Sequence, residues 1–452
     1  MEALPTFREA FKVWAYIGCV NFGGPAGQIA LMHRLLVEER KWISEERYFH
    51  ALNYCMLLPG PEAQQLATYV GWLMHGVRGG LAAGIMFILP GALVMLGLSL
   101  LYVEYAHVEV VADIFYGIKA AVLAIVIEAV VRISKRAFTG PAMHWIAGGA
   151  FVALFFLAVP FPIVVLVAAL TGFFGARFAP GQFHASGHKA GTSNAAVVYA
   201  IDAAFERGAL KHTQTTRGQT AATVAIWLAV WLTPMGVLAI AFGPSDLFTT
   251  MAVFFSKMSV VTFGGAYAVL AYVAQEAVAT YHWMTAPEML DGLALAETTP
   301  GPLILVLQHV GFLAAYRNAG LDPVLSGLFG AMITLWVTFV PSFLWIFAGA
   351  PYAERVRQNR ELSGALAAIT AAVVGVIMNL AVWFALHVLF ANVTIVSVWP
   401  LQLHVPDFST LNGAALALSL AAATGLLWFR LPIAILLVVC ATAGLLVRLL
   451  GL

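Results

Sequence analysis

The sequence predicts an all-α polytopic membrane protein, made of two inverted-topology repeats with broken, hairpin-forming half-helices. Of its 452 residues, 62% are hydrophobic and only 10% are charged, whereas roughly 25% of the residues of a soluble domain are charged. Apolar runs at 81–101, 110–131 and 223–242 approach the roughly 20 residues that cross a bilayer core. The net formal charge of +1 argues against a nucleic-acid-binding surface.

Two stretches of the chain are copies of each other. Three motifs recur 241 positions later without a gap: Phe22-Gly23-Gly24 as Phe263-Gly264-Gly265, Trp42 as Trp283, and Pro59-Gly60-Pro61 as Pro300-Gly301-Pro302. Further along, Pro90 and Ala120-Ala121-Val122 recur at an offset of 251, as Pro341 and Ala371-Ala372-Val373. A duplicated half in a membrane protein is typical of a transporter.

The basic residues indicate that the two repeats face opposite ways, because Lys and Arg collect in cytoplasmic loops. The loop around Trp42 holds four basic residues, whereas its copy around Trp283 holds none. The bias then reverses, since 104–109 holds none and the matching loop beyond Ala350 holds three. Matching loops therefore lie on opposite sides of the membrane. The basic residues are Arg34, Arg40, Lys41 and Arg47 in the first loop, and Arg355, Arg357 and Arg360 in the last.

These biases order the elements of the first repeat, which we assign to residues 1–177. Two hairpins, at 7–33 and 47–76, enter and leave on the cytoplasmic side. Spans near 80–104, 109–131, 142–160 and 161–177 then return the chain to the cytoplasm. A polar cytoplasmic linker follows at 178–217.

One further span, 218–242, has no copy in the first repeat. Inversion requires such an odd helix, because it delivers the second copy from the opposite face. The second repeat, 243–452, then has outward-opening hairpins at 247–276 and 286–316, followed by four spans. Counting each hairpin arm gives about thirteen transmembrane segments, and whether arms of about 15 residues cross fully stays open. The N-terminus is expected inside and the C-terminus outside.

Glycine and proline interrupt the apolar runs at matched positions of both repeats. Proline suits the first turn of a helix, and glycine permits conformations that end one. Each break therefore starts a half-helix, whose N-terminus has free N–H groups and about half a positive charge. Four such starts predict an anion site near the midplane; alternatively, the same residues merely kink packed helices. The candidates are Gly23, Gly24, Pro25, Gly27, Pro59, Gly60, Pro61, Gly264, Gly265, Pro300, Gly301 and Pro302.

Polar residues beside the breaks extend the predicted substrate site. Gln28 lies one turn into the first half-helix and Gln65 follows the second break. Thr262 and Thr299 come directly before the breaks of the second repeat. Amide and hydroxyl groups of this kind donate to the oxygens of an oxyanion.

Four ionisable residues in apolar sequence are further candidates, because a mid-membrane charge costs at least about 2.5 kcal/mol and usually faces a partner or a cavity. Glu62 and Glu297 are proton-coupling candidates, with helix capping as the alternative for Glu62 and a structural role open for Glu297. Lys119 either draws an anion inward or pairs with Asp113. Lys257 either contributes to the site or extends to the outer surface.

Other chemistry has no motif in this sequence. Cys19, Cys55 and Cys440 are isolated, so neither a disulfide framework nor a metal cluster is indicated, and no cofactor is expected. An enzyme would need a nucleophile–base or metal constellation, and no His-Glu-x-x-His or Gly-x-Ser-x-Gly occurs. No Gly-x-x-x-x-Gly-Lys-Ser/Thr loop occurs either, which argues against ATP as the driving force.

Three stretches resemble the chromate ion transporter (CHR) family in its long, two-domain form. They are Asn21-Phe-Gly-Gly-Pro-Ala-Gly-Gln-Ile29, Arg40-Lys-Trp-Ile-Ser-Glu45, and Ala51 to Tyr69 with its Leu-Leu-Pro-Gly-Pro-Glu-Ala-Gln-Gln core. The second-repeat motifs Thr262-Phe-Gly-Gly265 and Thr299-Pro-Gly-Pro302 resemble it too. The version Asn53 to Gln65 resembles the chromate-resistance subgroup, although Met56 and Ala266 depart from frequent family residues.

The resemblance implies a secondary transporter that exports chromate across a bacterial inner membrane and confers chromate resistance. Sulfate, a similar tetrahedral dianion, is a possible competitor, and alternating access by rocking of the two halves is the expected mechanism. The alternatives are a sulfate or related oxyanion transporter or exchanger, and an anion channel. Small-residue faces such as 365–372 serve packing within or between chains, so a homodimer stays open.

Overall fold

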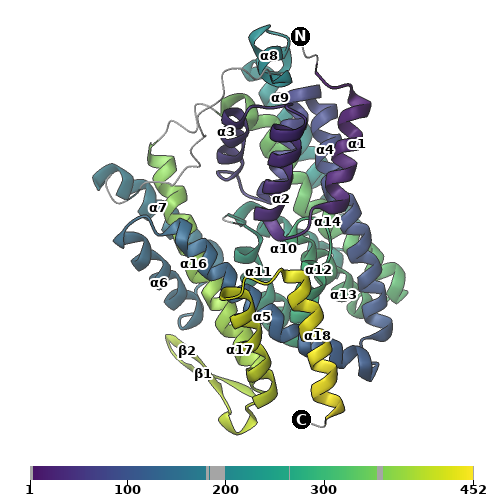
Figure 1. Ribbon diagram of the computed structural model, residues 1–452, viewed down its shortest axis with the longest axis vertical. Coiled ribbons are helices and arrows are strands. Elements are labelled where there is room, and N and C mark those ends of the chain that lie inside the picture. Colours follow the sequence, from purple (N-terminus) through teal and green to yellow (C-terminus); the bar gives the residue numbers. More distant parts are fainter. Residues whose placement is uncertain (1–3, 180–182, 184–198, 264, 354–359, 451–452) are drawn as a thin grey trace. The chain divides into compact units, whose positions relative to one another are not determined.

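The computed structural model of the protein describes residues 4–179, 183, 199–263, 265–353 and 360–450. In these ranges the chain is almost entirely helical (Figure 1). Six of the described helices are long and apolar enough to cross a membrane, in agreement with the predicted polytopic helical protein. They are α4 (Glu62–Tyr105), α5 (Glu109–Ala137), α7 (Phe161–Phe178), α9 (Arg217–Ala241), α14 (Pro323–Gly349) and α16 (Arg360–Leu389).

Contacts divide the chain into two compact units. Unit 1 comprises 1–96, 187–266 and 299–359, and unit 2 comprises 97–186, 267–298 and 360–452. The boundaries between the units fall within α4 and next to two of the glycine- and proline-containing breaks between helices. Each unit therefore contains segments of both sequence repeats.

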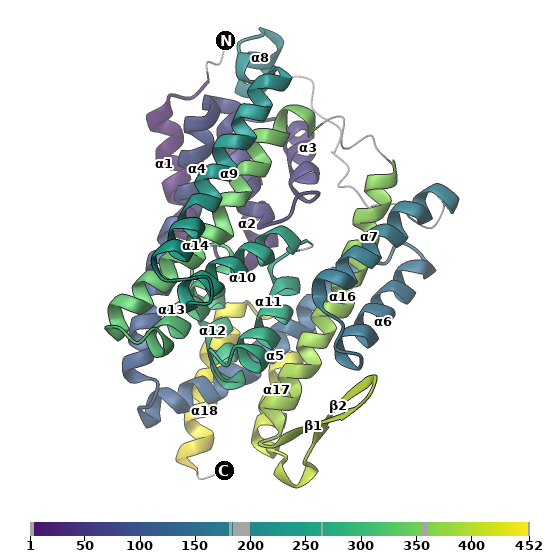
Figure 2. The ribbon, with the colours of Figure 1, turned by 180° about the vertical axis from the view of Figure 1, so that it is seen from behind.

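Unit 1 is built largely from short helices that are separated by the glycine- and proline-containing breaks. Its core contains fully buried Trp14, Tyr48 and Phe87. The helix α9 packs along α14 (Figure 2). The other elements are α1 (Phe7–Val20), α2 (Gly24–His33), the π-helix η1 (Arg34–Glu39), α3 (Glu45–Cys55), α8 (Ala200–Glu206), η3 (Lys211–Thr213), α10 (Leu247–Val261), η5 (Leu303–Leu305), α13 (Val306–Asn318) and η6 (Ala350–Tyr352).

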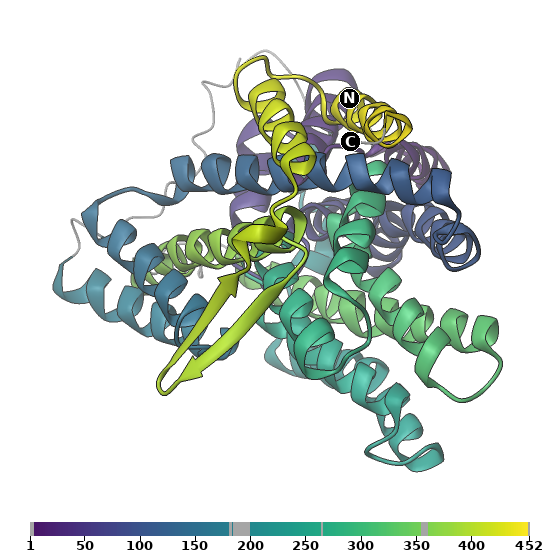
Figure 3. The same ribbon diagram turned by 90° about the horizontal axis from the view of Figure 1, so that it is seen from below.

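Unit 2 packs its helices through small residues. A Cβ on Gly117 of α5 would collide with the backbone oxygen of Cys440, and Gly172 of α7 lies equally close to Gly364 of α16. Helix α5, drawn in blue, lies against α17 and α18 (Figure 3). The remaining elements are α6 (Pro141–Phe155), α11 (Ala266–Gln275), the π-helix η4 (Glu276–Thr280), α12 (Ala286–Thr298), β1 (Val393–Val398), β2 (Leu401–Pro406), η7 (Phe408–Thr410), α17 (Gly413–Leu427) and α18 (Ile433–Leu449).

Local capping sets several helix starts in unit 1. Thr6 and Glu9 form a reciprocal capping box at the start of α1. The side chains of Ser44, Asp246 and Asp322 accept hydrogen bonds from first-turn N–H groups of α3, α10 and α14. These polar residues stand directly before the helices and cap them, so the boundaries follow from the sequence.

The duplication is visible in backbone detail. Lys41 and His282, 241 positions apart, both have φ of +53°, a conformation that is uncommon outside glycine. The next residue in each copy, Trp42 and Trp283, donates its N–H to a carbonyl six residues earlier at 2.8 Å. Each copy also has a π-helix just before this point, η1 and η4. The connection that contains Trp42 and its copy that contains Trp283 therefore share one local fold.

Helix α4 is interrupted where the sequence predicts a hairpin to end and a span to begin. His75 has φ −134° and ψ 24°, and Gly76 has φ 61° and ψ −151°, so the 44 residues form two helices. In the second repeat the corresponding connection is an open turn between α13 and α14. The predicted boundary between 76 and 80 is confirmed.

One element contradicts the all-α prediction. Residues Val393–Val398 and Leu401–Pro406 form an antiparallel hairpin of two strands, with Val393 opposite Pro406 and Val398 opposite Leu401. The first strand is rich in β-branched residues, which favour extended backbone. The prediction of four simple spans overlooked this local preference within an apolar stretch.

The linker contributes an ordered helix. Residues 180–182 and 184–198 of the predicted linker lie outside the described residues, but α8 packs on unit 1 through Ile201 and Ala204. The N–H groups of Ala200 and Ile201 donate to the carbonyls of Lys41 and Trp42 at 3.2 and 2.9 Å. The loop before α3 is thus held by backbone of the linker.

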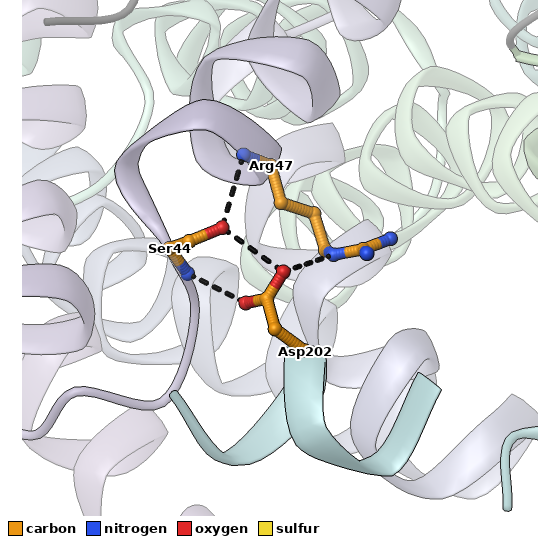
Figure 4. Close-up of polar contacts among 3 residues, drawn as sticks. All are labelled: Ser44, Arg47 and Asp202. Carbon is orange, nitrogen blue, oxygen red and sulfur yellow. Dashed lines mark hydrogen bonds and ion pairs between the residues drawn. The ribbon is translucent and has the colours of Figure 1, made fainter. Parts of the chain in front are cut away.

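Asp202 of α8 completes this contact (Figure 4). Its carboxylate accepts hydrogen bonds from the N–H and the hydroxyl of Ser44, both at 3.0 Å, and from Nε of Arg47 at 2.9 Å. The guanidinium of Arg47 also lies 4.4 Å from the ring centre of Phe205. One linker carboxylate therefore fixes the start of α3.

We expect Asp202→Ala to lower the free energy of unfolding by about 1–3 kcal/mol, because it removes three hydrogen bonds from a charged, half-buried acceptor. The melting temperature of the detergent-solubilised protein measures this. Glu206→Ala, on the exposed side of the same helix, is the matched control. Equal melting temperatures for the two variants would contradict a stabilising role for Asp202.

Candidate functional site

The breaks between helices lie in unit 1, and they are joined in pairs. The first break (21–23) separates α1 from α2, the second (56–61) α3 from α4, the third (262–265) α10 from α11, and the fourth (299–302) α12 from η5. The first and fourth breaks form one junction, and the second and third form another. Each junction therefore combines backbone from both repeats.

The first junction is centred on Asn21, which is fully buried. Its carbonyl oxygen accepts the N–H of Gly301 at 3.3 Å. The side-chain amide of Gln28 donates to the same carbonyl at 3.0 Å and to the carbonyl of Gly301 at 2.5 Å. The buried Gln28 thus braces the first break against the fourth.

The second junction mirrors the first. The N–H of Gly60 donates to the carbonyl of Thr262 at 2.8 Å. Gly60 and Gly301 are copies of each other, as are the positions of Thr262 and Asn21. The two inter-repeat hydrogen bonds are therefore equivalent, as expected for two repeats related by an approximate two-fold axis. Within the second break, the amide of Gln65 donates to the carbonyl of Pro59 at 2.7 Å.

Glycine is required at the breaks by backbone conformation. Five break glycines have positive φ, namely Gly23 (+89°), Gly24 (+66°), Gly60 (+121°), Gly265 (+96°) and Gly301 (+102°). A side chain in such a conformation is strained. Helices begin at Gly24, Glu62 and Ala266, and Pro302 precedes the short helix η5. The predicted half-helix starts are confirmed.

The break glycines differ in their surroundings. A Cβ on Gly60 would lie 2.8 Å from both Gln65 Nε2 and Ser342 Oγ, and a Cβ on Gly301 would lie 2.9 Å from Leu305. Gly24 and Gly265 have no atom within 4 Å of such a Cβ. The junction glycines are therefore tightly packed, whereas open space adjoins the starts of α2 and α11.

Two long helices support the junctions. Gly91, one residue after Pro90 in α4, lies so close to the carbonyl oxygen of Pro300 that a Cβ would collide with it. Ser342, which follows Pro341 in α14, takes the matching position beside Gly60. The sequence analysis found the repeated prolines but missed these contacts, because neither neighbour carries a recognisable motif.

The start of α2 is suited to an anion. No side chain caps it, and Gly23 precedes it in a left-handed conformation. Uncapped N–H groups of a first helical turn, together with the helix dipole, bind negative charge. Pro25 and Gly27 lie in this first turn.

The glutamines of the breaks hydrogen-bond to main-chain carbonyls. Both N–H groups of Gln28 are occupied by backbone carbonyls, so they hold the junction in this structure. The side-chain oxygens of the buried Gln28, Gln64, Gln65 and Gln308 have no hydrogen-bond partner among the described residues. These oxygens are acceptors, suited to water or to a proton-bearing ligand. Asn21 and Gln308 were not predicted, because isolated amides in apolar sequence are not distinctive.

The remaining break residues are placed as follows. Gly60, Pro61, Pro300, Gly301 and Pro302 are buried, and Pro59 is half-buried. The hydroxyl of Thr262 donates to the carbonyl of Met258 at 2.5 Å, and Thr299 is buried. Gly264 lies outside the described residues.

The ionisable candidates are divided between the units. Glu62 is half-buried at the start of α4, and Lys257 is exposed on α10, both in unit 1. Glu297 lies in unit 2, on α12, where its carboxylate accepts a hydrogen bond from the hydroxyl of the buried Tyr267 at 2.5 Å. The charges of Arg132 and Glu128 act on it electrostatically.

Lys119 forms an ion pair that the sequence did not identify. Its ammonium lies 3.3 Å from the carboxylate of Asp291 on α12, which also accepts the hydroxyl of Tyr102 at 2.9 Å. Asp113, the partner considered from the sequence, pairs instead with Arg448 at 3.5 Å. Asp291 was not among the candidates from the sequence, although it lies within a helix and is 5% exposed.

Comparison with known families gives a match over most of the chain. The model described as chromate transporter matches residues 8–173 and 249–445, that is, both repeats without the linker. A chromate transport protein of Pseudomonas aeruginosa is 31% identical over 382 residues, covering 83% of this chain and 81% of that protein. One from Cupriavidus metallidurans is 27% identical over 372 residues, covering 82% and 81%.

A probable chromate transport protein of Synechococcus elongatus is 24% identical over 419 residues, covering 91% of this chain and 95% of that protein. The comparison with solved structures gave no match.

Proposed function

Because the chain belongs to the chromate transporter family, in its long form with two family-model halves, we propose that it exports chromate from the cytoplasm and confers chromate resistance. The family is one of transporters and not of enzymes. The observation that carries the proposal is the pair of equivalent junctions in unit 1, where glycine-rich breaks of both repeats meet. The names of the relatives from P. aeruginosa and C. metallidurans support chromate as the substrate, and the motif Asn53 to Gln65 supports the resistance subgroup.

The anion is bound by backbone N–H groups at the half-helix starts. The start of α2 is the leading contact, since Gly24 adjoins open space. A tetrahedral dianion matches several convergent N–H donors and needs no buried arginine. Gln28 and Gln65 act at this site by fixing the break carbonyls, and their unpaired oxygens hold water around the ion.

Voltage is sufficient to drive export. An inside-negative potential assists the exit of an anion by about 2.3 kcal/mol per charge per 100 mV. Transport is then alternating access in a bacterial inner membrane, with the N-terminus cytoplasmic and the C-terminus periplasmic. Reporter fusions in loops 34–47 and 276–291, expected on opposite sides, test the inversion.

We expect Glu297→Gln to remove any dependence of transport on a pH gradient while leaving voltage-driven transport intact. The reason is that Glu297, held by Tyr267 at 2.5 Å, is the carboxyl best placed to exchange a proton. Transport into vesicles with an imposed pH gradient measures this, with Glu288→Gln on the same helix as control. An unchanged pH dependence in Glu297→Gln would assign the residue a structural role.

The decisive experiment follows labelled chromate into everted membrane vesicles, with voltage and pH gradients imposed separately and excess sulfate in a parallel run. Saturable chromate accumulation supports the proposed carrier. Movement of sulfate without chromate would transfer the function to a sulfate-type transporter or exchanger. Flux that neither saturates nor shows counterflow would indicate an anion channel.

A further inference from the structure

Unit 2 contains a basic cavity that the transport mechanism does not use. It has a volume of about 520 Å³ and lies between the end of α5 and the turn that joins α17 to α18. All of its lining residues belong to unit 2. The charged ones are Arg132, Lys135, Arg136 and Arg430, with Glu128.

The cavity has an excess of positive charge. Glu128 lies 3.5 Å from Arg132, so these two largely neutralise each other. Lys135 and Arg430 are exposed and add two positive charges to its wall. Clustered charge of one sign in a concave, partly apolar wall attracts ligands of the opposite sign.

The turn that carries Arg430 has a strained and specific shape. Arg430 has φ of +53°, which is rare for a residue other than glycine and often marks a functional position. The N–H of Leu431 donates to the carbonyl of Gly425 at 3.1 Å and so closes the turn. Trp428 and Phe429, just before it, are 83% and 71% exposed.

The rest of the wall is apolar. Leu427, Leu431 and Ile433 line the cavity beside the cations. A small hydrated oxyanion has no apolar surface to bury against such a wall. A phospholipid, in contrast, places its phosphate among the cations and its glycerol and acyl carbons along the leucines. Exposed tryptophan next to arginine is typical of the headgroup level of a bilayer, and basic pockets between transmembrane helices bind anionic headgroups.

We propose that this cavity binds the phosphate headgroup of an anionic phospholipid. Lys135 and Arg430 hold the phosphate, and Trp428 and Phe429 anchor the turn in the surrounding lipid. The site does not depend on which anion the protein transports.

The test uses the full-length protein in nanodiscs of phosphatidylcholine with increasing phosphatidylglycerol, and measures the melting temperature and the phosphatidylglycerol retained after purification. Phosphatidylglycerol should raise the melting temperature of the wild type. In Arg430→Asn, the phosphatidylglycerol fraction that gives half of this rise should be about five-fold higher, which corresponds to the loss of one cation near a headgroup. Asparagine is chosen because it tolerates a left-handed conformation. Lys12→Gln, an exposed cation of unit 1, is the matched control and should behave as the wild type.

Two outcomes overturn the proposal. The first is an equal phosphatidylglycerol response in wild type, Arg430→Asn and a Lys135→Gln/Arg430→Asn double variant. The second is saturable binding of inorganic phosphate or chromate in pure phosphatidylcholine that the double variant loses, without any preference for phosphatidylglycerol, which would assign the cavity to free oxyanions. A lower melting temperature of a variant in pure phosphatidylcholine reports on folding alone. The phosphatidylglycerol response of each variant is therefore measured relative to its own melting temperature in pure phosphatidylcholine.

Discussion

Gly24→Val is expected to reduce chromate transport to background while the protein still folds and inserts. Gly24 has φ of +66° and begins α2, so valine there costs about 1–2 kcal/mol of backbone strain. No atom lies within 4 Å of the added Cβ, so the fold accommodates it. The valine methyl groups would instead fill the space through which the anion reaches the N–H groups of the first turn. Uptake into everted vesicles, normalised to folded protein, measures the loss.

The chain offers a closely matched control. Gly208 has φ of +65° and also has no atom within 4 Å of an added Cβ, but it lies in the turn after α8, away from the breaks. Gly208→Val should therefore show the same strain and normal transport. Gly24→Asn, which relieves the strain and still fills the space, should fail like Gly24→Val. Normal transport by Gly24→Asn would refute the backbone site.

Lys119→Met should strongly reduce the amount of folded protein. It leaves the carboxylate of Asp291, 5% exposed in an apolar region, without its ammonium partner at 3.3 Å. Removing one partner of a buried ion pair costs about 3–5 kcal/mol, and the partial exposure of Lys119 places this pair at the lower end of that range. The yield of monodisperse protein and its melting temperature measure the effect.

A second substitution separates stability from transport. Lys119→Met combined with Asp291→Asn removes both charges, so folding should recover. If the folded double variant does not transport, Lys119 acts electrostatically on the anion; if it transports normally, the pair is structural. Lys257→Met, which removes an exposed lysine of α10, is the control and should be silent. A stable single variant, Lys119→Met, would contradict a stabilising ion pair.

The positions of the breaks could be predicted from the sequence, because glycine and proline at matched places restrict the backbone locally. Helix starts at Gly24, Glu62 and Ala266 follow from this chemistry. The pairing of the breaks could not be predicted. Gly60 meets Thr262 through main-chain atoms, and a main-chain hydrogen bond leaves no signature in the side chains.

The ionisable groups show the same limit. Lys119 was recognised as a charge that needs a partner, and the sequence suggested Asp113. Only the packing of the helices selects Asp291 instead. The hydrogen-bond partners of Gln28 could not be predicted either, since its donors face two carbonyls supplied by residues 7 and 273 positions away. The hairpin at 393–406 was missed because its β-branched residues stand in a generally apolar stretch.

The two junctions between the repeats also determine the order in which the protein assembles during its synthesis. The N–H of Gly60 finds its partner only in the second repeat, at Thr262, and the carbonyl of Asn21 gains its second donor there, at Gly301. Synthesis adds about 5–20 residues per second, so these groups wait roughly 10–50 s for their partners to leave the ribosome. During this interval the first repeat carries unpaired polar backbone that hydrocarbon does not tolerate. Unit 1 therefore assembles only after the last helices of the first repeat are already inserted, and its nascent half remains dependent on water or on the insertion machinery until then.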